Sequence, residues 1–364
     1  MAPLVKAFQK HPNQFDTKVC VTAQHREMLD QVLSFFEITP HYDLDLMKPG
    51  QNLYGLTADI ITNLKPVLED FQPDYVFVHG DTTTTMAGSI ASFYSGAKVC
   101  HVEAGLRTHN KLSPFPEEIN RQIAGRVCDY HFAPTDTSKQ NLLQENINES
   151  TILVTGNTVI DALLESVKRV KKKPSFHIQE LSKTLKDKEM ILVTGHRREN
   201  HGQGFDRICA ALKIIAQDCP NRLIVYPVHL NPRVQEPVKR ILKDVANVIL
   251  IDPLSYPDFI WMMSRAKIII TDSGGVQEEA PSLGKPVLVM RDTTERPEAV
   301  DAGTVILVGT DKEKIIREAL DLLNNKNRFD DMSKLHNPYG DGNASEKIVD
   351  YMAKLGVKKV KKLN

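Results

Sequence analysis

Short apolar runs rich in β-branched residues alternate with longer stretches of helical spacing along nearly the whole chain. The runs are apolar almost throughout, which is typical of strands buried on both faces of a parallel sheet. Because parallel strands need a long crossover connection, usually a helix, the alternation predicts an α/β fold with helices on the sheet faces. The expected strands lie at residues 18–22, 74–80, 97–103, 129–135, 151–156, 189–195, 222–228, 247–251, 267–272, 285–290 and 304–309.

The chain has 364 residues, more than a single core usually supports, so we expect two domains. A lysine-rich stretch over residues 168–190 separates the two sets of runs and has no sustained apolar face. It is either an interdomain linker that includes a fraying helix end or an exposed, solvated helix. Both interpretations place the boundary near residue 165, which gives a first domain over 1–165 and a second over 166–344.

Lysine and arginine total 46, as do aspartate and glutamate, so the formal net charge is zero. A neutral chain lacks the field that general binding of nucleic acid or of an anionic membrane needs, and we expect neither partner. No stretch approaches the roughly 18 apolar residues of a membrane span, and the first residues lack the apolar core of a secretory signal. We therefore expect a cytoplasmic protein that holds any anionic ligand in a local site.

Three carboxylates follow expected strands of the first half, in VHGDTTTT (Asp81), HVEAGLRT (Glu103) and PFPEEINR (Glu117). The carboxyl ends of parallel strands meet at one edge of a sheet, so we expect the three to converge, with Arg107 near Asp81. Such a cluster suits proton removal and delivery on a sugar. Helix capping is the alternative for the threonine-rich turn and for the glutamates.

A metal site is the rival interpretation of the same segments, because His79-x-Asp81 and His101-x-Glu103 supply nitrogen and oxygen ligands. Residues i and i+2 of a strand share a face, however, so each pair is also compatible with a hydrogen-bonded couple. We expect no metal.

The second half carries an anion-binding pattern at two expected strand ends. VTGHRREN follows one strand with His196 and two arginines, a cationic group that suits pyrophosphate. In TDSGGVQEEA, Ser273, Gly274 and Gly275 end a strand and open a helix, where bare N–H groups and the helix dipole favour phosphate. Glu279 then lies in the first turns of that helix, in a position to accept from ribose hydroxyls.

These segments, taken together, closely resemble the non-hydrolysing UDP-N-acetylglucosamine 2-epimerases, and the resemblance runs essentially from end to end. The shared motifs, in family order, are VHGDTTTT, HVEAGLRT, PEEINR, GNTVIDAL, GHRREN, YPVHLNP, TDSGGVQEEAPSLGKPVLV and RDTTERPE. The resemblance implies a glycosyltransferase-B-type fold, in which two Rossmann-like domains face each other across a cleft and a C-terminal helix, here 345–364, returns to the first domain. It also implies a homodimer and a cytoplasmic role in the synthesis of cell-surface polysaccharides.

The activity that the resemblance implies is the reversible inversion of C2 of UDP-N-acetylglucosamine to give UDP-N-acetylmannosamine. UDP is eliminated anti to give 2-acetamidoglucal and is then added back syn. No cofactor is implied, and the sequence has no GxGxxG fingerprint of a dinucleotide site. Asp81, Glu103 and Glu117 match the acid/base carboxylates, of which we favour Asp81 as the base.

The resemblance places UDP in the second domain, with His196 at a phosphate. The other substrate contacts that it implies are Leu254 and Phe259 near uracil, Ser273, Gly274 and Gly275 at the diphosphate, Glu279 at the ribose, and Arg296 closing the site. A segment at residues 22–29 resembles the part of bacterial members that binds a second, activating UDP-N-acetylglucosamine, which implies Gln24 and His25. A helix N-cap is the alternative there.

One further expectation concerns a departure from the family, and two alternatives for the activity stay open. The family begins with a strand and a Gly-Thr-Arg-Pro-Glu-type loop that contacts the nucleotide, whereas this sequence starts inside the helix that follows. We expect the loss of a central strand to leave backbone groups unpaired. The open alternatives for the activity are a UDP-sugar glycosyltransferase of the same fold and a non-catalytic UDP-sugar sensor.

Overall fold

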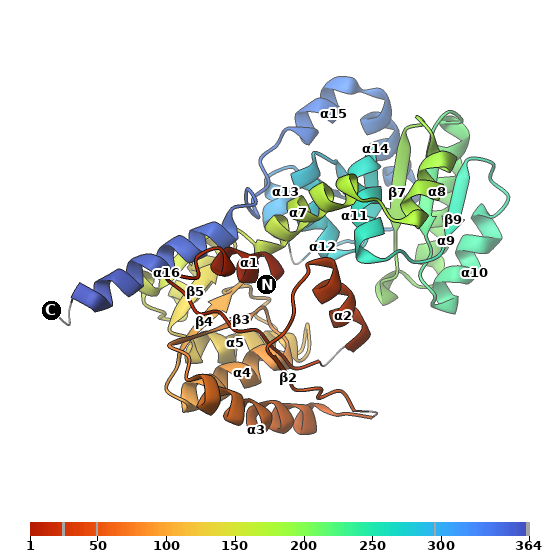
Figure 1. Cartoon of the computed structure of the whole chain (residues 1–364). Helices are drawn as coiled ribbons and strands as arrows, with labels where there is room; N and C mark the ends of the chain where they lie inside the picture. The colour runs from red at the N-terminus through yellow and green to blue at the C-terminus, as the bar shows by residue number, and fades with distance from the viewer. Residues whose placement is uncertain (24–25, 49, 295, 362–364) are drawn as a thin grey trace. The chain divides into compact units, whose positions relative to one another are not determined.

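The chain divides into two compact units in the computed structural model, which describes residues 1–23, 26–48, 50–294 and 296–361 (Figure 1). Met1–Ala162 and Tyr339–Asn364 form the first unit, and Leu163–Pro338 form the second. The sequence pattern predicts boundaries at residues 165 and 344, close to these positions. Each unit contains a parallel sheet with helices on its faces, so the predicted α/β fold class is confirmed.

The first unit is built on a four-stranded parallel sheet in the order β3-β4-β5-β6. A separate parallel pair, of which only the first strand is predicted from the sequence, precedes it. The bounds are β1 (Cys20–Val21), β2 (Tyr42–Asp43), β3 (Tyr75–His79), β4 (Lys98–Val102), β5 (Tyr130–Ala133) and β6 (Ile152–Val154).

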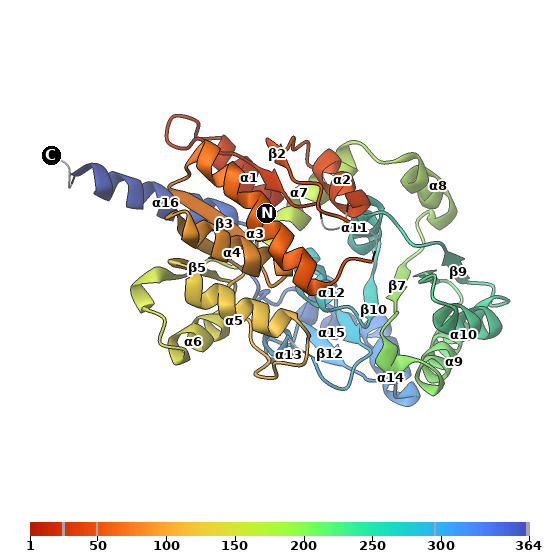
Figure 2. The ribbon, with the colours of Figure 1, turned by 90° about the horizontal axis from the view of Figure 1, so that it is seen from below.

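Helices cover both faces of this sheet. On one face α3 (Leu53–Phe71), α4 (Thr83–Tyr94) and α5 (Glu117–Val127) lie side by side, as Figure 2 shows. On the other, α1 (Ala2–Gln9) and α16 (Ala344–Lys361) pack together, and their apolar side chains join those of β4 and β5 in one core cluster. The remaining helices of the unit are α2 (Arg26–Phe35) and α6 (Asp136–Gln144).

The return of the C-terminal helix to the first unit is therefore confirmed, and a buried carboxylate fixes it. Asp161 accepts from the backbone N–H groups of Ala344 and Ser345 at 3.2 and 2.7 Å, where α16 begins. These are orphan donors of the first turn, which a helix cannot satisfy internally.

The second unit has a six-stranded parallel sheet in the order β12-β11-β10-β7-β8-β9. The chain proceeds outward from β7 in one direction and from β10 in the other, so the order reverses between these two neighbours. Open α/β sheets bind ligands beyond the carboxyl ends of the strands at such a switch point. The bounds are β7 (Met190–Thr194), β8 (Leu223–Pro227), β9 (Val248–Ile251), β10 (Ile268–Thr271), β11 (Val287–Val289) and β12 (Val305–Leu307).

Helices α9 (Gln203–Asp218), α10 (Pro232–Leu242) and α14 (Lys312–Asn324) pack against one face of this sheet and bury an extensive apolar cluster. α11 (Tyr256–Arg265) contacts β7 and α8 (Phe176–Leu185). The other helices are α7 (Thr158–Lys172), α12 (Gly274–Glu279), α13 (Pro297–Asp301) and α15 (Lys326–Ser333).

The description of residues 168–190 as a stretch without an apolar face is wrong. α8 lies within this stretch and buries Ile178, Leu181 and Leu185. Their spacing of three and four residues places them on one side of a helix, and the many lysines of the surrounding stretch hide that pattern in the sequence. Among the residues that the structure describes, no helix is long and apolar enough to span a membrane.

Candidate active site

The switch point of the second unit is organised by a buried carboxylate that the sequence motifs do not single out. Asp272 follows β10, is fully buried, and accepts from the backbone N–H groups of His196 and Arg197, each at 2.9 Å. The side-chain amide of Asn200 donates to the same oxygen at 3.3 Å. Asp272 therefore ties the turn after β7 to the end of β10, the two strands between which the sheet order reverses.

His196 stands on this turn with its ring at the surface. Its Nδ1 lies 3.4 Å from the second carboxylate oxygen of Asp272, and its ring stacks on that of His229, with centroids 5.5 Å apart. The side chain is 47% exposed. The Asp272 carboxylate and the His229 ring thus orient the imidazole. Its Nε2 atom has no hydrogen bond among the described residues, so it can contact a phosphate oxygen.

The Ser-Gly-Gly segment opens α12, as predicted, with Ser273 as the N-cap residue. The first N–H groups of any α-helix lack intrahelical partners and carry partial positive charge. A Cβ atom added at Gly275 would meet nothing within 4 Å, so open space adjoins these donors. Gln277 holds the segment from behind, because it donates to the Ser273 carbonyl at 3.2 Å and accepts from the Thr294 hydroxyl at 2.7 Å.

Two adjacent glutamates of α12 have different surroundings. Glu278 is buried and forms an ion pair with Arg296, the N-cap residue of α13. Glu279 is 9% exposed, and burial together with the neighbouring Glu278 raises its pKa to about 8. Near neutral pH this carboxyl therefore holds a proton in the ligand-free protein. A ligand that donates hydrogen bonds to it would favour the ionised form.

The two predicted uracil contacts lie at the start of α11, where Leu254 and Phe259 are half-buried. Tyr256, between them, lies close to Glu279. Burial and the nearby Glu279 raise the pKa of this phenol to about 12. The structure thus brings the N-terminus of α11 to the helix that carries Glu279, in agreement with one binding site for both sets of residues.

In the first unit, Asp81 follows β3 and lies against α5. Its carboxylate accepts from Arg121 at 2.5 Å, and its backbone carbonyl accepts from the Asn120 side chain at 3.0 Å. The Asp81 side chain is 30% exposed. The arginine paired with Asp81 is Arg121, whereas the buried side chain of Arg107, expected near Asp81, forms a two-point ion pair with Glu145.

Glu103 follows the neighbouring strand β4 and has a backbone φ of +64°. Non-glycine residues avoid this left-handed region, and such outliers concentrate at functional sites. The carboxylate lies 3.2 Å from the Nε2 atom of His79 on β3. The conformation aims the glutamate toward the end of the adjacent strand, so Asp81 and Glu103 come from neighbouring strand ends, as predicted.

His101 hydrogen-bonds to the backbone next to Asp81. Burial lowers its pKa to about 3, so the ring is neutral. Its Nε2 lies 2.7 Å from the carbonyl oxygen of Gly80, which can only accept, so Nε2 carries the proton and donates. Gly80 has φ of +70°. The histidine therefore holds the turn that presents Asp81.

The Glu-Glu pair at the start of α5 divides into one structural and one available carboxylate. Glu118 is fully buried and accepts from the backbone N–H groups of Thr108 and His109 at 3.0 and 3.2 Å. Glu117 is half-buried, and we find no hydrogen bond or ion pair for its carboxylate within the described part of the chain. Glu118 thus fixes the loop at Thr108 and His109, α5 has no side-chain cap hydrogen bond, and Glu117 is left available for chemistry.

The metal interpretation gains no support from the geometry. His79 is paired with Glu103 and His101 with Gly80, so both histidines are engaged across strands and neither forms a couple within its own strand. In residues 1–23, 26–48, 50–294 and 296–361 there is no group of three or more His, Cys, Asp or Glu side chains that could hold a metal ion.

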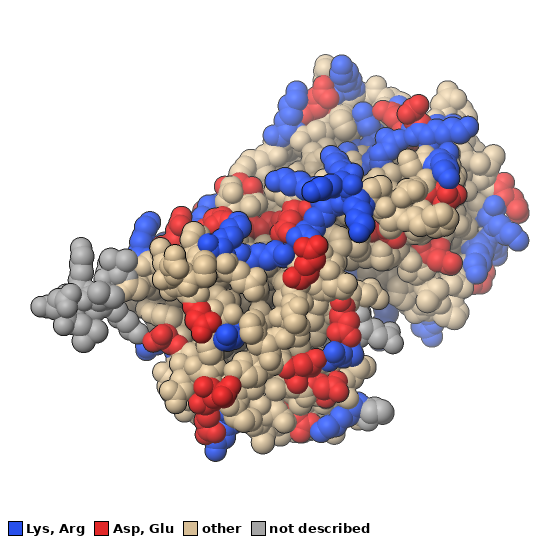
Figure 3. All heavy atoms as spheres, viewed as in Figure 1, with Lys and Arg blue, Asp and Glu red and all other residues tan. Residues whose placement is uncertain are grey.

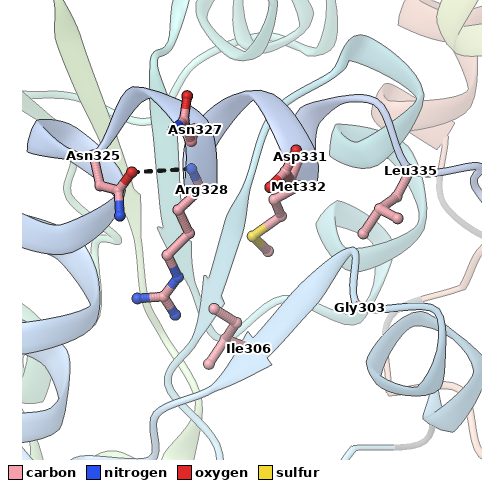
Figure 4. A pocket seen from close by; sticks show the side chains of 8 residues that line it. All are labelled: Gly303, Ile306, Asn325, Asn327, Arg328, Asp331, Met332 and Leu335. Carbon is pink, nitrogen blue, oxygen red and sulfur yellow. Dashed lines mark hydrogen bonds between the residues drawn. The ribbon is translucent and has the colours of Figure 1, made fainter.

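A pocket of about 490 Å³ lies elsewhere in the second unit, beside β12 and α15 (Figure 4). Ile306, Met332 and Leu335 supply its apolar wall, and Arg328 is held by an ion pair with Glu318 at 2.5 Å. The described residues that line it include none of the predicted site residues, so we do not assign it to the candidate site.

The most informative residues that motif reasoning missed are Arg121 and Asp272. Both stand inside recognised segments, PEEINR and TDSGG, where a basic residue four positions after Glu117 and a buried strand-end aspartate are the available signals. Gln24 and His25, predicted for a regulatory site, lie outside the described residues.

Comparison with known proteins gives one consistent family. A family model described as UDP-N-acetylglucosamine 2-epimerase matches residues 6–353. Curated proteins of that name from Escherichia coli are 59% identical over 354 residues, which cover 96% of this chain and 94% of each relative.

Solved structures agree over the same extent. The UDP-GlcNAc 2-epimerase from Neisseria meningitidis, solved bound to UDP-GlcNAc, is 52% identical with a TM-score of 0.86, and the match covers 97% of this chain and 96% of that one. The enzyme from Methanocaldococcus jannaschii, in complex with UDP-GlcNAc and UDP, is 32% identical with a TM-score of 0.76, and the match covers 97% and 95%.

Proposed function

Because this chain belongs to the UDP-N-acetylglucosamine 2-epimerase family, we propose that it is a non-hydrolysing epimerase that interconverts UDP-N-acetylglucosamine and UDP-N-acetylmannosamine. The observation that carries the proposal is the presence of two complementary strand-end sites. The switch point of the second unit offers donors for a diphosphate. In the first unit, Asp81 and Glu103 come from neighbouring strand ends, and Glu117 begins α5, the helix whose Arg121 pairs with Asp81. Relatives solved with UDP-GlcNAc and UDP support the choice of ligand.

In the second unit, the proposed nucleotide contacts follow the local chemistry. The N–H groups at Ser273, Gly274 and Gly275 and the exposed ring of His196 bind the diphosphate, whose charge suits a helix N-terminus. Glu279 accepts from the ribose hydroxyls, and Arg296 remains paired with Glu278 at the rim. Leu254 and Phe259 supply apolar surface for the uracil.

The chemical step needs a base, because C2–H of the sugar is not acidic. We assign Asp81 as the base, held by Arg121. It takes the C2 proton while the electron pair of that C–H bond forms the C1–C2 double bond and the C1–O bond breaks, so UDP leaves with the bonding pair. In the return step a UDP oxygen forms the bond to C1, and C2 takes a proton on its other face.

Glu103 and Glu117 are assigned to that second proton transfer and to holding the 2-acetamidoglucal. The leaving group is stabilised by the donors of the second unit, in the manner of a preformed oxyanion site. Atoms balance without an oxidant or a metal, since C2 loses one proton and gains another from solvent, and the UDP that leaves C1 is added back to C1.

Incubation with UDP-N-acetylglucosamine in D2O, followed by ¹H and ³¹P NMR, tests this function. We expect the anomeric signal of UDP-N-acetylmannosamine, deuterium at C2 and unchanged diphosphate signals. Release of free N-acetylmannosamine would instead indicate a hydrolysing enzyme. A requirement for an acceptor would indicate a glycosyltransferase, and binding without turnover a sensor.

The Asp81→Asn variant tests the base. We expect loss of deuterium incorporation at C2, with UDP affinity in calorimetry within about twofold of the parent protein, because the nucleotide contacts belong to the second unit. Unchanged incorporation would contradict the assignment.

The remaining assignments concern partners. We propose a homodimer, activation by UDP-N-acetylglucosamine at a second site that includes Gln24 and His25, and a product used for cell-surface polysaccharide. Light scattering measures the first of these. Sigmoidal dependence of the rate on UDP-N-acetylglucosamine, abolished in Gln24→Ala, measures the second.

A further inference from the structure

Helix α8 packs against α11, and hydrogen bonds join the two helices at both ends of α11. At one end the hydroxyl of Ser175, the N-cap residue of α8, donates to Asp258 at 2.7 Å. At the other end the guanidinium of Arg265 donates to the carbonyl oxygen of Lys186 at 2.6 Å. Asp258 lies in the first turn of α11 and Arg265 in the last, so α8 is attached to both termini of this helix.

Asp258 is the acceptor at the first of these contacts. The residue is 6% exposed, and its second carboxylate oxygen lies 3.2 Å from the Nδ1 atom of His177. A carboxylate can only accept, so the histidine donates through Nδ1. Each oxygen of this buried carboxylate therefore takes a donor from the beginning of α8, which offsets the cost of its burial.

The position of Asp258 is one at which a carboxylate usually serves its own helix. Ser255 is the N-cap residue of α11, and its hydroxyl accepts from the Asp258 N–H at 3.5 Å. The pattern Ser-x-x-Asp is typical of a capping box, in which the carboxylate turns back to its own N-cap. Here hydrogen bonds from α8 occupy both oxygens, so the first turn of α11 is tied to a separate segment.

Helix α8 is itself anchored in the second unit. Its side chains Ile178, Leu181 and Leu185 are buried, whereas Lys and Arg side chains gather on the surface over α7 and the neighbouring part of the unit (Figure 3). The Ser175 hydroxyl also accepts from the N–H of Ile178 at 3.1 Å, which fixes it on α8. Hydrogen bonds from such a packed helix can hold a functional segment in place.

The first turn of α11 belongs to the candidate nucleotide site. Leu254 and Phe259, the predicted uracil contacts, flank this turn and are half-buried, and Phe259 directly follows Asp258. α11 also packs against the short helix Ala280–Leu283, which continues α12 after Glu279, the predicted ribose contact. The turn that α8 holds is therefore the one that carries the predicted contacts to the base.

We propose that Ser175 and His177 are positioning residues that act through Asp258 to hold the first turn of α11 at the base of the bound nucleotide. The inference rests on the proposed function, in which Leu254 and Phe259 contact uracil. A turn that is held in place before the ligand arrives loses less conformational freedom on binding, so the contact increases affinity for the base. The proposed diphosphate donors lie on other segments, after β7 and at the start of α12, and do not depend on it.

Two ligands separate this role from general stabilisation, namely UDP, which carries the base, and inorganic pyrophosphate, which lacks it. Calorimetry measures the dissociation constant of UDP, and displacement of bound UDP measures that of pyrophosphate. His177→Ala and Ser175→Ala should each raise the UDP constant about fivefold, the effect of about one lost hydrogen bond. The pyrophosphate constant should stay within about twofold of the parental value, because its donors are independent of the contact. In turnover, KM for UDP-N-acetylglucosamine should rise while kcat stays the same.

Three variants serve as controls. His177→Asn keeps a donor close to the position of Nδ1 and Ser175→Thr keeps the hydroxyl, so both should retain the parental UDP constant. Arg265→Met removes the hydrogen bond at the other end of α11, so it should lower the melting temperature and leave both binding constants unchanged.

The alanine variants decide the outcome. A UDP constant equal to that of the parent, or equal rises for UDP and pyrophosphate, would overturn the positioning role. The binding measurements need no turnover, so a parent protein that binds UDP without forming the epimer would contradict the proposed reaction and not this inference.

Discussion

The two strand-end clusters use carboxylates in opposite ways. In the second unit, Asp272 is fully buried and accepts from two backbone N–H groups, and Glu278 is buried against Arg296. In the first unit, Asp81 is 30% exposed, and Glu117 is half-buried with no hydrogen-bond or ion-pair partner among the described residues. The second unit uses Asp272 and Glu278 as buried acceptors that hold the backbone and side chains around them. The first unit leaves Asp81 and Glu117 partly exposed.

This difference follows from what each cluster has to do. In the proposed function, backbone donors and an imidazole bind the diphosphate. They must be in place before the ligand arrives, which agrees with the buried carboxylates Asp272 and Glu278 that hold the neighbouring groups. A proton is removed only by a carboxylate that the substrate can reach. The φ of +64° at Glu103 shows that the first unit also accepts backbone strain to present such a group.

The largest expected effect separates the adjacent glutamates of α5. Glu117→Gln should lower the turnover number by about 10²–10⁴-fold, the usual contribution of a proton-transferring group, because the amide keeps the shape and cannot exchange the proton. Its melting temperature should stay close to that of the parent, since no partner of this carboxylate lies in the described part of the chain. NMR-monitored turnover and thermal denaturation measure the two quantities.

The matched change one residue later should act on stability. Glu118→Gln loses the charge that accepts from Thr108 and His109, and we expect about 1–3 kcal/mol lower free energy of unfolding. A Glu117→Gln enzyme with parental turnover would remove the distinction between the two carboxylates.

The next effect tests the scaffold of the second unit. Asp272→Ala leaves the N–H groups of His196 and Arg197 and the amide of Asn200 without their acceptor, so we expect about 3 kcal/mol lower stability. UDP affinity should fall at least tenfold as the turn loosens. Urea denaturation and calorimetry check both values. Asp218→Ala, an exposed change in the same unit, should stay within about 0.5 kcal/mol.

The smallest effect depends on pH and concerns Glu279. Its usual pKa is 4.5 and its pKa in the folded protein is about 8. Between these pH values the folded chain keeps a proton that the unfolded chain has lost, so this group lowers stability progressively as pH rises toward 8. Glu279→Gln removes the ionisation, and we expect it to raise the free energy of unfolding by about 2 kcal/mol at pH 9 and by little at pH 4.

The same ionisation should appear in binding. Ribose hydroxyls that donate to Glu279 favour its charged form, so UDP binding near pH 7 should release a proton from the parent protein. Calorimetry in buffers of different ionisation enthalpy detects that release, and the glutamine variant should lose it. Equal pH profiles for parent and variant stability would count against the buried, protonated carboxyl.

Much of the fold was predictable because strands buried on both faces of a parallel sheet are continuous apolar runs in the sequence. The expected runs from 74–80 to 304–309 all contain strands, and the Ser-Gly-Gly segment opens a helix as expected. β2 and the apolar face of α8 were not predicted. A two-residue strand has no periodicity, and the three apolar residues Ile178, Leu181 and Leu185 lie in a stretch that is otherwise rich in lysine.

The members of the candidate site are predictions from sequence motifs, and the structure adds the partners that these residues meet. Motif positions identified Asp81, Glu103 and Glu117, yet the arginine at Asp81 is Arg121 rather than Arg107. Both arginines follow a strand-end motif, and only the packing of α5 on α4 and of α6 on the sheet decides which carboxylate each one meets.

The sequence alone therefore determined the α/β architecture with its two units and indicated the candidate segments at the strand ends, because burial and turn formation depend on residues close together in the chain. The tertiary structure decided which carboxylates remain accessible and which accept hydrogen bonds in a purely structural role. The reason is that hydrogen bonds such as those from His196 to Asp272 and from Thr108 to Glu118 join segments that are distant in the sequence. Two carboxylates of the same type can therefore have different roles, depending on which segment packs against each one.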